Sequence, residues 1–276
     1  MLQPGLIMDR PLLISAVIEH AAAQFGDVEI VSRETHGPLF RYTYAHCAAR
    51  ARQLAHALQG LGLRAGDAVA TLAWNNHRHL EAYYAVSGSG LVIHTCNPRL
   101  HPDQLIYIIN HAEDRALFFD RTFAPLIERI APCCPTIEAW IALSDPSNMP
   151  ELAGVDNLLC YEDCIAPHPG KFDWPQFGER SAAALCYTSG TPGNPKGVLY
   201  SHRAIVLNAT ACCLPGVLSI SPRDAILPAV PMFHVNGWCL PYAAPISRSS
   251  PDRWPSGGSR MKLYFSIPCR WEAPAR

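Results

Sequence analysis

Residues 186–203, CYTSGTPGNPKGVLYSHR, place a loop rich in glycine, proline and hydroxyl groups between two apolar segments. Glycines, which lack a Cβ, let a ligand approach the backbone, and successive N–H groups in such a turn can surround a phosphate oxygen. Hydroxyl side chains add hydrogen-bond donors, and a lysine adds a compact positive charge. The residues of these kinds are Thr188, Ser189, Gly190, Thr191, Gly193, Lys196 and Gly197. The stretch therefore predicts an anion-binding loop over residues 188–197.

This loop differs from a Walker A loop, which requires the pattern G-x-x-x-x-G-K-[ST] ahead of a helix. Counting from Gly190, Pro195 stands at the second glycine position and Gly197 at the hydroxyl position. The apolar run before the loop and the VLYSH that follows it favour two strands joined by the loop. Ser201 is then expected to cap a helix. The alternative is an ordinary hairpin turn rich in Gly, Pro and Asn.

Upstream of the loop, apolar residues alternate between helical and strand spacing. The expected elements are a helix over 13–25, a hairpin of 28–33 with 39–43, a long helix capped by Thr43, a strand–helix–strand unit over 68–96, and further alternation through 102–145. This order predicts an α/β fold with mostly parallel sheets and helices on both faces. Residues 146–180 contain five prolines and weak periodicity, which predicts a surface excursion. His77 and His79 do not share a helical face, and we expect both at the surface.

Composition excludes several classes of function. The net charge is −1 and no basic run occurs, so nucleic acid is not an expected partner. The first twenty residues are interrupted by Asp9, Arg10 and Glu19, which fits neither a signal peptide nor a transmembrane segment. Eleven cysteines occur without a C-x-x-C pair. We therefore expect reduced thiols in a cytoplasmic protein and no metal site.

The loop resembles the phosphate loop of the adenylate-forming (AMP-binding) superfamily, which reads T-S-G-T-T-G-x-P-K-G. PMFHVNGW (231–238) is similar to a second core motif of that family, and residues 42–90 are similar to its N-terminal subdomain. Residues 97–119, NPRLHPDQLIYIINHAEDRALFF, resemble the medium- and long-chain fatty acyl-CoA synthetases. The resemblance implies that residues 1–246 form the N-terminal part of the AMP-binding domain.

The resemblance implies ATP-dependent activation of a fatty acid carboxylate to an acyl-adenylate, followed by transfer to coenzyme A. The residues expected to hold the ATP phosphates are Thr188, Ser189, Gly190, Thr191, Gly193 and Lys196. Lys196 and His234 are the catalytic candidates, with His234 near the acyl carboxylate, and Trp238 is expected to gate the acyl tunnel. A packed aromatic cluster is the alternative for His234 and Trp238. Fatty acyl members are often dimers, but this sequence gives no independent sign of one.

Pro192 departs from the family pattern because it stands where the family has a second threonine. Proline removes both a hydroxyl and a backbone N–H donor. One charge-assisted hydrogen bond is worth about 1.5–3 kcal/mol. We therefore expect phosphate binding about ten- to a hundredfold weaker than with threonine.

A second departure begins after residue 246. Residues 247–276 have neither helical nor strand period, and they contain six Lys/Arg against two Asp/Glu. This composition predicts an aberrant tail, either disordered or read out of frame after a frameshift near codon 246. The family's adenine- and magnesium-binding motif, ribose-binding aspartate and C-terminal lid are expected further downstream and do not occur in this chain. Magnesium would thus accompany ATP without a ligand from these residues.

Three functions remain open at this point. The first is a fatty acyl-CoA ligase whose sequence here is truncated and inactive as written. The second is a non-catalytic fragment that binds nucleotide weakly. The third is an interaction partner that pairs with a full-length relative through exposed strand edges and apolar surface.

Overall fold

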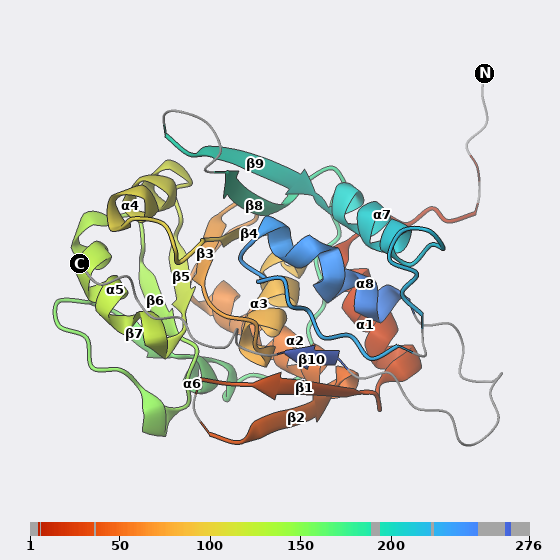
Figure 1. Ribbon diagram of the computed structural model, residues 1–276, viewed down its shortest axis with the longest axis horizontal. Helices are drawn as coiled ribbons and strands as arrows, with labels where there is room; N and C mark the ends of the chain where they lie inside the picture. The colour runs from red at the N-terminus through yellow and green to blue at the C-terminus, as the bar shows by residue number, and fades with distance from the viewer. Residues whose placement is uncertain are drawn as a thin grey trace.

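The computed structural model describes residues 5, 7–35, 37–188, 194–221, 224–247 and 263–265. The main sheet contains β3 (Ala68–Leu72), β4 (Val92–Thr95), β5 (Ala116–Phe119), β6 (Ala139–Ala142), β7 (Leu158–Cys160), β8 (Ala182–Thr188) and β9 (Lys196–Ser201). These strands lie in the order β7-β6-β5-β3-β4-β8-β9 (Figure 1). Neighbouring strands are parallel except for β8 and β9, which are antiparallel. The predicted α/β fold with a mostly parallel sheet is confirmed.

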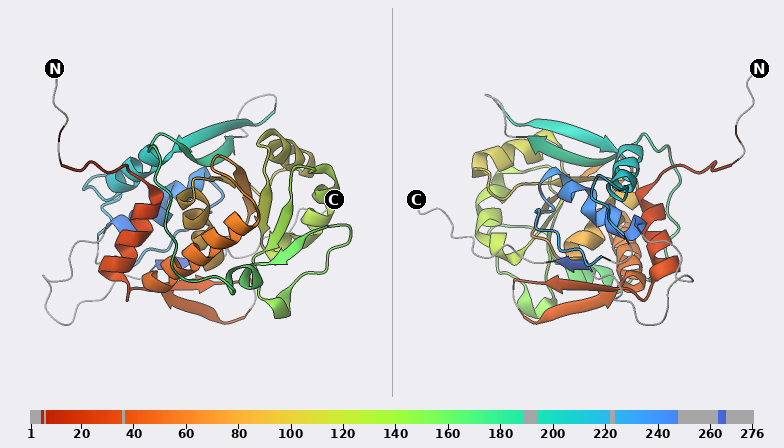
Figure 2. Two further views of the ribbon diagram at one scale, coloured as in Figure 1. Left: turned by 180° about the vertical axis from the view of Figure 1, so that it is seen from behind. Right: turned by 45° about the vertical axis from the view of Figure 1, so that its right-hand side comes forward.

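Helices cover both faces of this sheet (Figures 1 and 2). One face carries α1 (Ile14–Phe25), α2 (Tyr44–Gly60), α3 (His77–Gly88), α6 (Tyr161–Ile165), α7 (His202–Cys212) and α8 (Leu240–Ile246). The other carries α4 (Pro102–His111) and α5 (Ala124–Ile130). Successive side chains of a strand point to opposite faces. Accordingly Phe118 of β5 packs with the first set of helices, and its neighbours Leu117 and Phe119 pack with the second.

Short 3-10 helices complete the connections in the described part of the chain. They are η1 (Arg121–Phe123), η2 (Ala131–Cys133), η3 (Pro146–Asn148) and η4 (Val235–Cys239). Two predicted helix caps are confirmed. The Thr43 hydroxyl accepts a hydrogen bond from the His46 amide at the start of α2, and the Ser201 hydroxyl accepts one from the Ala204 amide at the start of α7. Each cap satisfies an N–H that has no partner within its own helix.

A second, smaller sheet lies below the helices in Figure 1. It contains β1 (Glu29–Arg33), β2 (Leu39–Thr43) and β10 (Leu263–Phe265), with β1 in the middle. β1 and β2 form the predicted antiparallel hairpin. β10 pairs in parallel with the other edge of β1, although residues 263–265 show no strand period in the sequence. Three residues are too few to show a sequence period, and an available strand edge supplies their backbone partners.

The interpretation of residues 146–180 as a surface excursion is also wrong in part. This segment contains β7, which pairs in parallel with β6 and extends the main sheet, and α6, which follows it directly. The Tyr161 side chain at the start of α6 is fully buried. The prolines lie on either side of these two short elements, and their number concealed the elements in the sequence.

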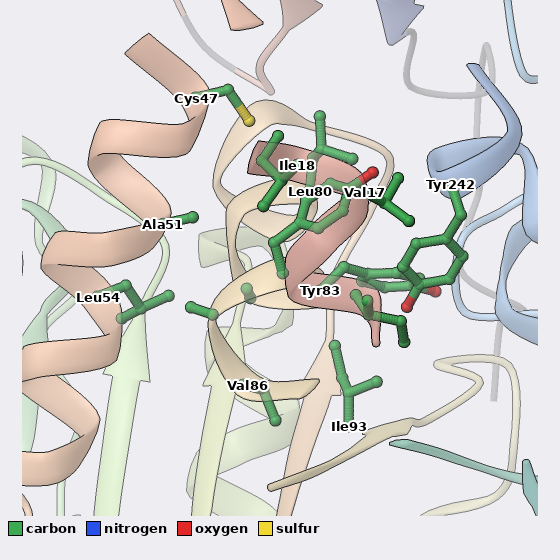
Figure 3. Close-up of a cluster of buried hydrophobic side chains, with 14 of the residues drawn as sticks. Val17, Ile18, Cys47, Ala51, Leu54, Leu80, Tyr83, Val86, Ile93 and Tyr242 are labelled. Atoms are coloured by element: carbon green, nitrogen blue, oxygen red, sulfur yellow. The ribbon is translucent and has the colours of Figure 1, made fainter. Parts of the chain in front are cut away.

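Helix α3 is the centre of the larger hydrophobic core (Figure 3). Leu80, Tyr83 and Val86 of this helix lie between α1, α2 and α8 in that view. All twelve residues of α3 are buried. A helix surrounded on every side by protein must bury its polar residues as well as its apolar ones.

His77 and His79 are therefore buried, and the expectation that they lie at the surface is wrong. His79 is satisfied inside the core, because its Nδ1 lies 3.0 Å from the Trp74 carbonyl oxygen and its Nε2 lies 3.0 Å from the Thr71 hydroxyl. The imidazole of His77 stacks on Phe40, with ring centroids 3.9 Å apart. Burial lowers the pKa of both imidazoles, so both are neutral near pH 7.

The cysteines in the described ranges carry free thiols, and most of them are buried. Burial raises the pKa of the Cys96, Cys212 and Cys239 thiols, which keeps these thiols protonated and apolar in character. Within these same ranges, no helix is long and apolar enough to cross a membrane.

Candidate functional site

Strands β8 and β9 flank the predicted phosphate loop. Thr188, the last residue of β8, pairs with Lys196, the first residue of β9, so the two ends of the loop are held side by side. Ser189, Gly190, Thr191 and Gly193, together with Pro192, lie outside the described residues. The prediction that the loop joins two strands is confirmed at both of its ends.

Lys196 and Thr188 are exposed at the end of this hairpin. Within the described residues, no carboxylate lies within ion-pair distance of Lys196. Gly197 follows, and a Cβ placed on it would lie 3.1 Å from Leu185 Cδ1 and 3.2 Å from Tyr187 Cζ. The absence of a side chain at Gly197 thus lets the two strands pack closely beside a lysine that is available to an anion.

Asn75, Asn76 and Asp120 lie at the carboxyl ends of β3 and β5, where open α/β sheets commonly bind ligands. The chain passes from β4 across to β5 on the other side of β3, which makes this a topological switch point. Asp120 accepts a hydrogen bond of 2.5 Å from the Trp74 amide and bonds of 3.1 Å from Asn76 Nδ2. Burial raises the pKa of Asp120 to about 7, in spite of these donors.

The segment that contains His234 and Trp238 begins beside this edge. The Phe233 side chain is buried against Trp74, with ring centroids 6.1 Å apart. His234, the next residue, is exposed, and its amide donates to the Pro231 carbonyl at 3.0 Å. η4 then carries three non-glycine residues with positive φ, namely Val235 (43°), Trp238 (54°) and Cys239 (59°). Such conformations are rare for these residue types, and they concentrate at functional sites.

A groove of about 550 Å³ runs between α7, η4 and β9. Its lining is Tyr200, Ala204, Ile205, Asn208, Cys212, Val217, Leu218, Val235, Trp238 and Cys239. The main polar side chain is Asn208, and its Nδ2 donates to Cys239 Sγ at 3.0 Å. Most of the lining side chains are apolar, and the Asn208 amide has one of its hydrogens bonded within the wall, so the groove offers a surface suited to a hydrocarbon chain.

The groove and the loop are connected through β9. Tyr200 lines the groove and Lys196 ends the predicted phosphate loop, and these two residues lie on one strand. They are four residue steps apart along the strand, which corresponds to roughly 13 Å. η4 also packs against β8, which leads into the other end of the loop.

The structure thus places Trp238 in the groove and Lys196 at the loop. It does not place His234 among the residues that line the groove in the described part of the chain. A role for His234 beside the acyl carboxylate stays a prediction.

The sequence interpretation missed Asn208, which lies on α7 outside any motif. It also missed Asn75, whose position directly after a buried parallel strand was the available signal. No group of three or more His, Cys, Asp or Glu side chains that could hold a metal occurs within the described ranges.

The fold and the site define an α/β protein in which the β8–β9 hairpin lies beside an apolar groove. The family model for AMP-binding enzymes matches residues 18–250, and the chain belongs to this family. Among its relatives, the 3-methylmercaptopropionyl-CoA ligase of Ruegeria pomeroyi is 50% identical over 245 residues, which cover 89% of this chain and 45% of that protein. The medium-chain-fatty-acid–CoA ligase of Ectopseudomonas oleovorans is 48% identical over 240 residues, covering 87% of this chain and 44% of that protein.

A solved structure supports the same fold. The long-chain-fatty-acid-CoA ligase from Archaeoglobus fulgidus superposes with a TM-score of 0.75 at 19% identity, covering 94% of this chain and 48% of that one. The chain therefore spans a little under half the length of the relatives that it matches, and it corresponds to their N-terminal part.

Proposed function

We propose that this chain binds ATP through the loop at 188–197 and a medium- or long-chain fatty acid in the groove beside Trp238. We also propose that these two sites serve the acyl-CoA ligase reaction of the chain's relatives. The supporting observation is the connection through β9, which carries Lys196 at one end and the groove residue Tyr200 near the other. Free, mostly buried thiols are compatible with a cytoplasmic location, which we also propose.

The proposed reaction has two steps. A carboxylate oxygen of the fatty acid attacks the α-phosphorus of ATP, the bond to the bridging oxygen breaks, and pyrophosphate leaves with the electron pair. The sulfur of coenzyme A then attacks the acyl carbon, and AMP leaves while the thiol proton passes to solvent. Positioning and charge neutralisation dominate catalysis of phosphoryl-type transfers. Lys196 would neutralise phosphate charge, Thr188 would donate from its hydroxyl, and magnesium accompanying ATP would neutralise the remaining charge.

Calorimetric titration of the full chain with ATP and, separately, with decanoate tests the two binding sites. We expect Lys196→Ala to weaken ATP binding about ten- to a hundredfold, because it removes a charge-assisted contact, and to leave decanoate binding unchanged. Trp238→Ala should weaken decanoate binding and leave ATP binding unchanged. Lys171→Ala is the matched control, because Lys171 is also exposed but lies far along the chain from both sites. Equal losses in the control would refute the assignment of Lys196.

Pro192→Thr tests the departure from the family loop. The substitution restores a hydroxyl and an N–H donor, so we expect ATP binding to become about ten- to a hundredfold tighter. Decanoate affinity should stay constant. Unchanged ATP affinity would mean that the backbone N–H and hydroxyl at residue 192 do not reach the phosphates.

An alternative function is a non-catalytic fragment that binds nucleotide weakly or pairs with a full-length relative. The observation in its favour is the exposed apolar surface of β9 and α7, which includes Val198, Leu199 and Leu207. ATP–pyrophosphate exchange with a panel of fatty acids separates the alternatives. Exchange above the Lys196→Ala background supports catalysis by this chain. Binding without exchange, together with co-purification of a co-expressed full-length ligase, supports the alternative.

A further inference from the structure

We propose that Asn75 is a positioning residue for the groove, and that it acts with Tyr83 by fixing the backbone of Met232. Both side chains belong to the β3–α3 unit, and Met232 lies in the segment that leads into η4. These contacts hold the wall of the groove, and only the ligand that the groove binds rests on the proposed function.

The side chain of Asn75 makes three hydrogen bonds to one distant segment. Its Nδ2 donates to the Pro228 carbonyl at 3.2 Å and to the Val230 carbonyl at 2.9 Å. Its Oδ1 accepts from the Met232 amide at 2.6 Å. Asn75 is 2% exposed, so these bonds are shielded from water. An asparagine side chain has two amide hydrogens and one carbonyl oxygen. Here the amide nitrogen and the carbonyl oxygen of one side chain bond to alternate residues, 228, 230 and 232, of a single segment.

Tyr83 completes the attachment of Met232. Its hydroxyl donates to the Met232 carbonyl, and both residues are fully buried. Met232 thus has its N–H bound by Asn75 and its C=O bound by Tyr83. The next tyrosine along α3, Tyr84, donates to the Pro241 carbonyl at 2.6 Å, which lies just beyond η4. The 3-10 helix is therefore held at both ends by side chains of the β3–α3 unit.

Met232 is in direct contact with η4. Gly237 adopts a φ of +62°, and a Cβ placed on it would lie 3.4 Å from Met232 Cα and 3.3 Å from Pro241 Cδ. A shift of the Met232 backbone would therefore displace Gly237, and with it the adjoining Trp238 and Cys239 that line the groove. Backbone in rare φ regions persists only where the surroundings over-determine it. The bonds from Asn75 and Tyr83 supply that constraint.

Hydrogen exchange of the full chain, measured at the amides of residues 232–239, tests the proposal without any ligand. We expect Asn75→Ala and Tyr83→Phe each to accelerate exchange in this segment at least tenfold. The matched controls are Asn110→Ala, which removes an amide bonded to the Cys133 carbonyl, and Tyr161→Phe, which removes a buried hydroxyl bonded to Glu81. These controls should leave residues 232–239 unchanged. Tyr83→Phe retains the buried ring, so it remains informative if Asn75→Ala does not fold.

Decanoate titration provides the functional measurement. We expect both variants to raise the decanoate Kd about five- to tenfold while the ATP Kd stays within twofold, because neither residue contacts β8 or β9 through a hydrogen bond in the described part of the chain. If wild-type protein fails to bind decanoate, the proposed acyl function fails, and hydrogen exchange still decides the role of Asn75. Unchanged exchange in both variants, or equal acceleration in the controls, would overturn the proposal.

Discussion

Helix α3 and the surface formed by β9, α7 and η4 distribute their side chains in opposite ways. α3 contains His77, Arg78 and Glu81 and is buried along its whole length. The second surface exposes large apolar side chains on both faces of the sheet edge. Trp238 is 55% exposed in the groove, and Leu199 is 63% exposed on the face opposite the one to which the groove residue Tyr200 points. In most proteins the polar residues would lie outside and the apolar ones inside. The contrast shows that burial in this molecule depends on the partners that distant segments provide.

The polar residues of α3 are buried because each has a charged or hydrogen-bonding partner. Arg78 Nε lies 2.7 Å from Glu162 and its Nη1 lies 2.8 Å from Glu34. Glu81 accepts from Arg50 Nε at 2.9 Å and from the Tyr161 hydroxyl at 2.6 Å. A charge inside a protein is tolerated only where such partners compensate for lost hydration.

Within the described ranges, the apolar residues of the second surface have no comparable cover. Large apolar patches on a protein surface commonly mark ligand grooves or interaction sites. Part of this surface is the groove lined by Trp238, and part is the outer side of the edge strand β9. The two regions therefore predict opposite responses to substitution, with large losses of stability at buried ion pairs and small ones at exposed apolar residues.

The largest effect is expected from Arg50→Met, which leaves the fully buried carboxylate of Glu81 without its cation. We expect the free energy of unfolding to fall by about 3–5 kcal/mol, because an uncompensated charge remains inside the protein. Burial already raises the pKa of Glu81, and Arg50 acts against this rise. Urea denaturation at pH 7 measures the change.

Arg41→Met is the matched control for this prediction. Arg41 pairs with Glu29 at 2.8 Å, but their side chains are 50% and 28% exposed. Water screens this pair, so we expect a loss of about 1 kcal/mol or less. Similar losses in the two variants would show that burial does not distinguish the α3 network from a surface ion pair.

A smaller effect, which depends on pH, is expected at Asp120. This buried carboxyl holds the turn before α3, and its pKa is raised from 3.8 to about 7 by burial. The folded state therefore retains a proton that the unfolded state releases, and stability should fall as pH rises from about 4 to about 7 and then level off. The upper bound of this loss is about 4 kcal/mol. Urea denaturation at several pH values measures it.

Asp120→Asn removes the titration while keeping the neutral shape of the side chain. The new amide faces Asn76 Nδ2, so the variant starts with a mismatch that does not vary with pH. We therefore compare slopes, and we expect the stability of the variant to depend less on pH between 4 and 7 than that of wild type. Parallel curves would show that Asp120 ionises in the folded state as it does in the unfolded one.

The sequence predicted features that depend on neighbouring residues. The caps at Thr43 and Ser201 each involve an amide three residues away, and the β3–α3–β4 unit follows from local periodicity. The burial of α3 could not be predicted in this way, because Glu34 and Glu162 are 44 and 84 residues from Arg78. Short strands such as β7 and β10 show no period because they contain only three residues.

The same distinction applies to the candidate site. The hairpin that carries the predicted phosphate loop was predictable, since the motif and both strands are contiguous in the sequence. The groove was predictable only at Trp238, where a family motif marked it. Its other walls come from α7 and from residues 217–218, and Asn75 acts on a segment 157 residues away. No local sequence pattern indicates a contact between residues so far apart in the chain.

The smallest effect is expected from Leu199→Gln on the exposed side of β9. We expect the free energy of unfolding to change by about 0.5 kcal/mol or less, as for other exposed positions, and self-association measured by light scattering to decrease. Leu185 is the matched comparison, because it pairs directly with Leu199 across the hairpin and is only 7% exposed. Leu185→Gln buries an amide without a partner and should cost about 1–3 kcal/mol. If the two substitutions destabilise equally, the outer side of β9 is covered in solution, and the contrast between the exposed apolar surface and the buried polar helix does not hold there.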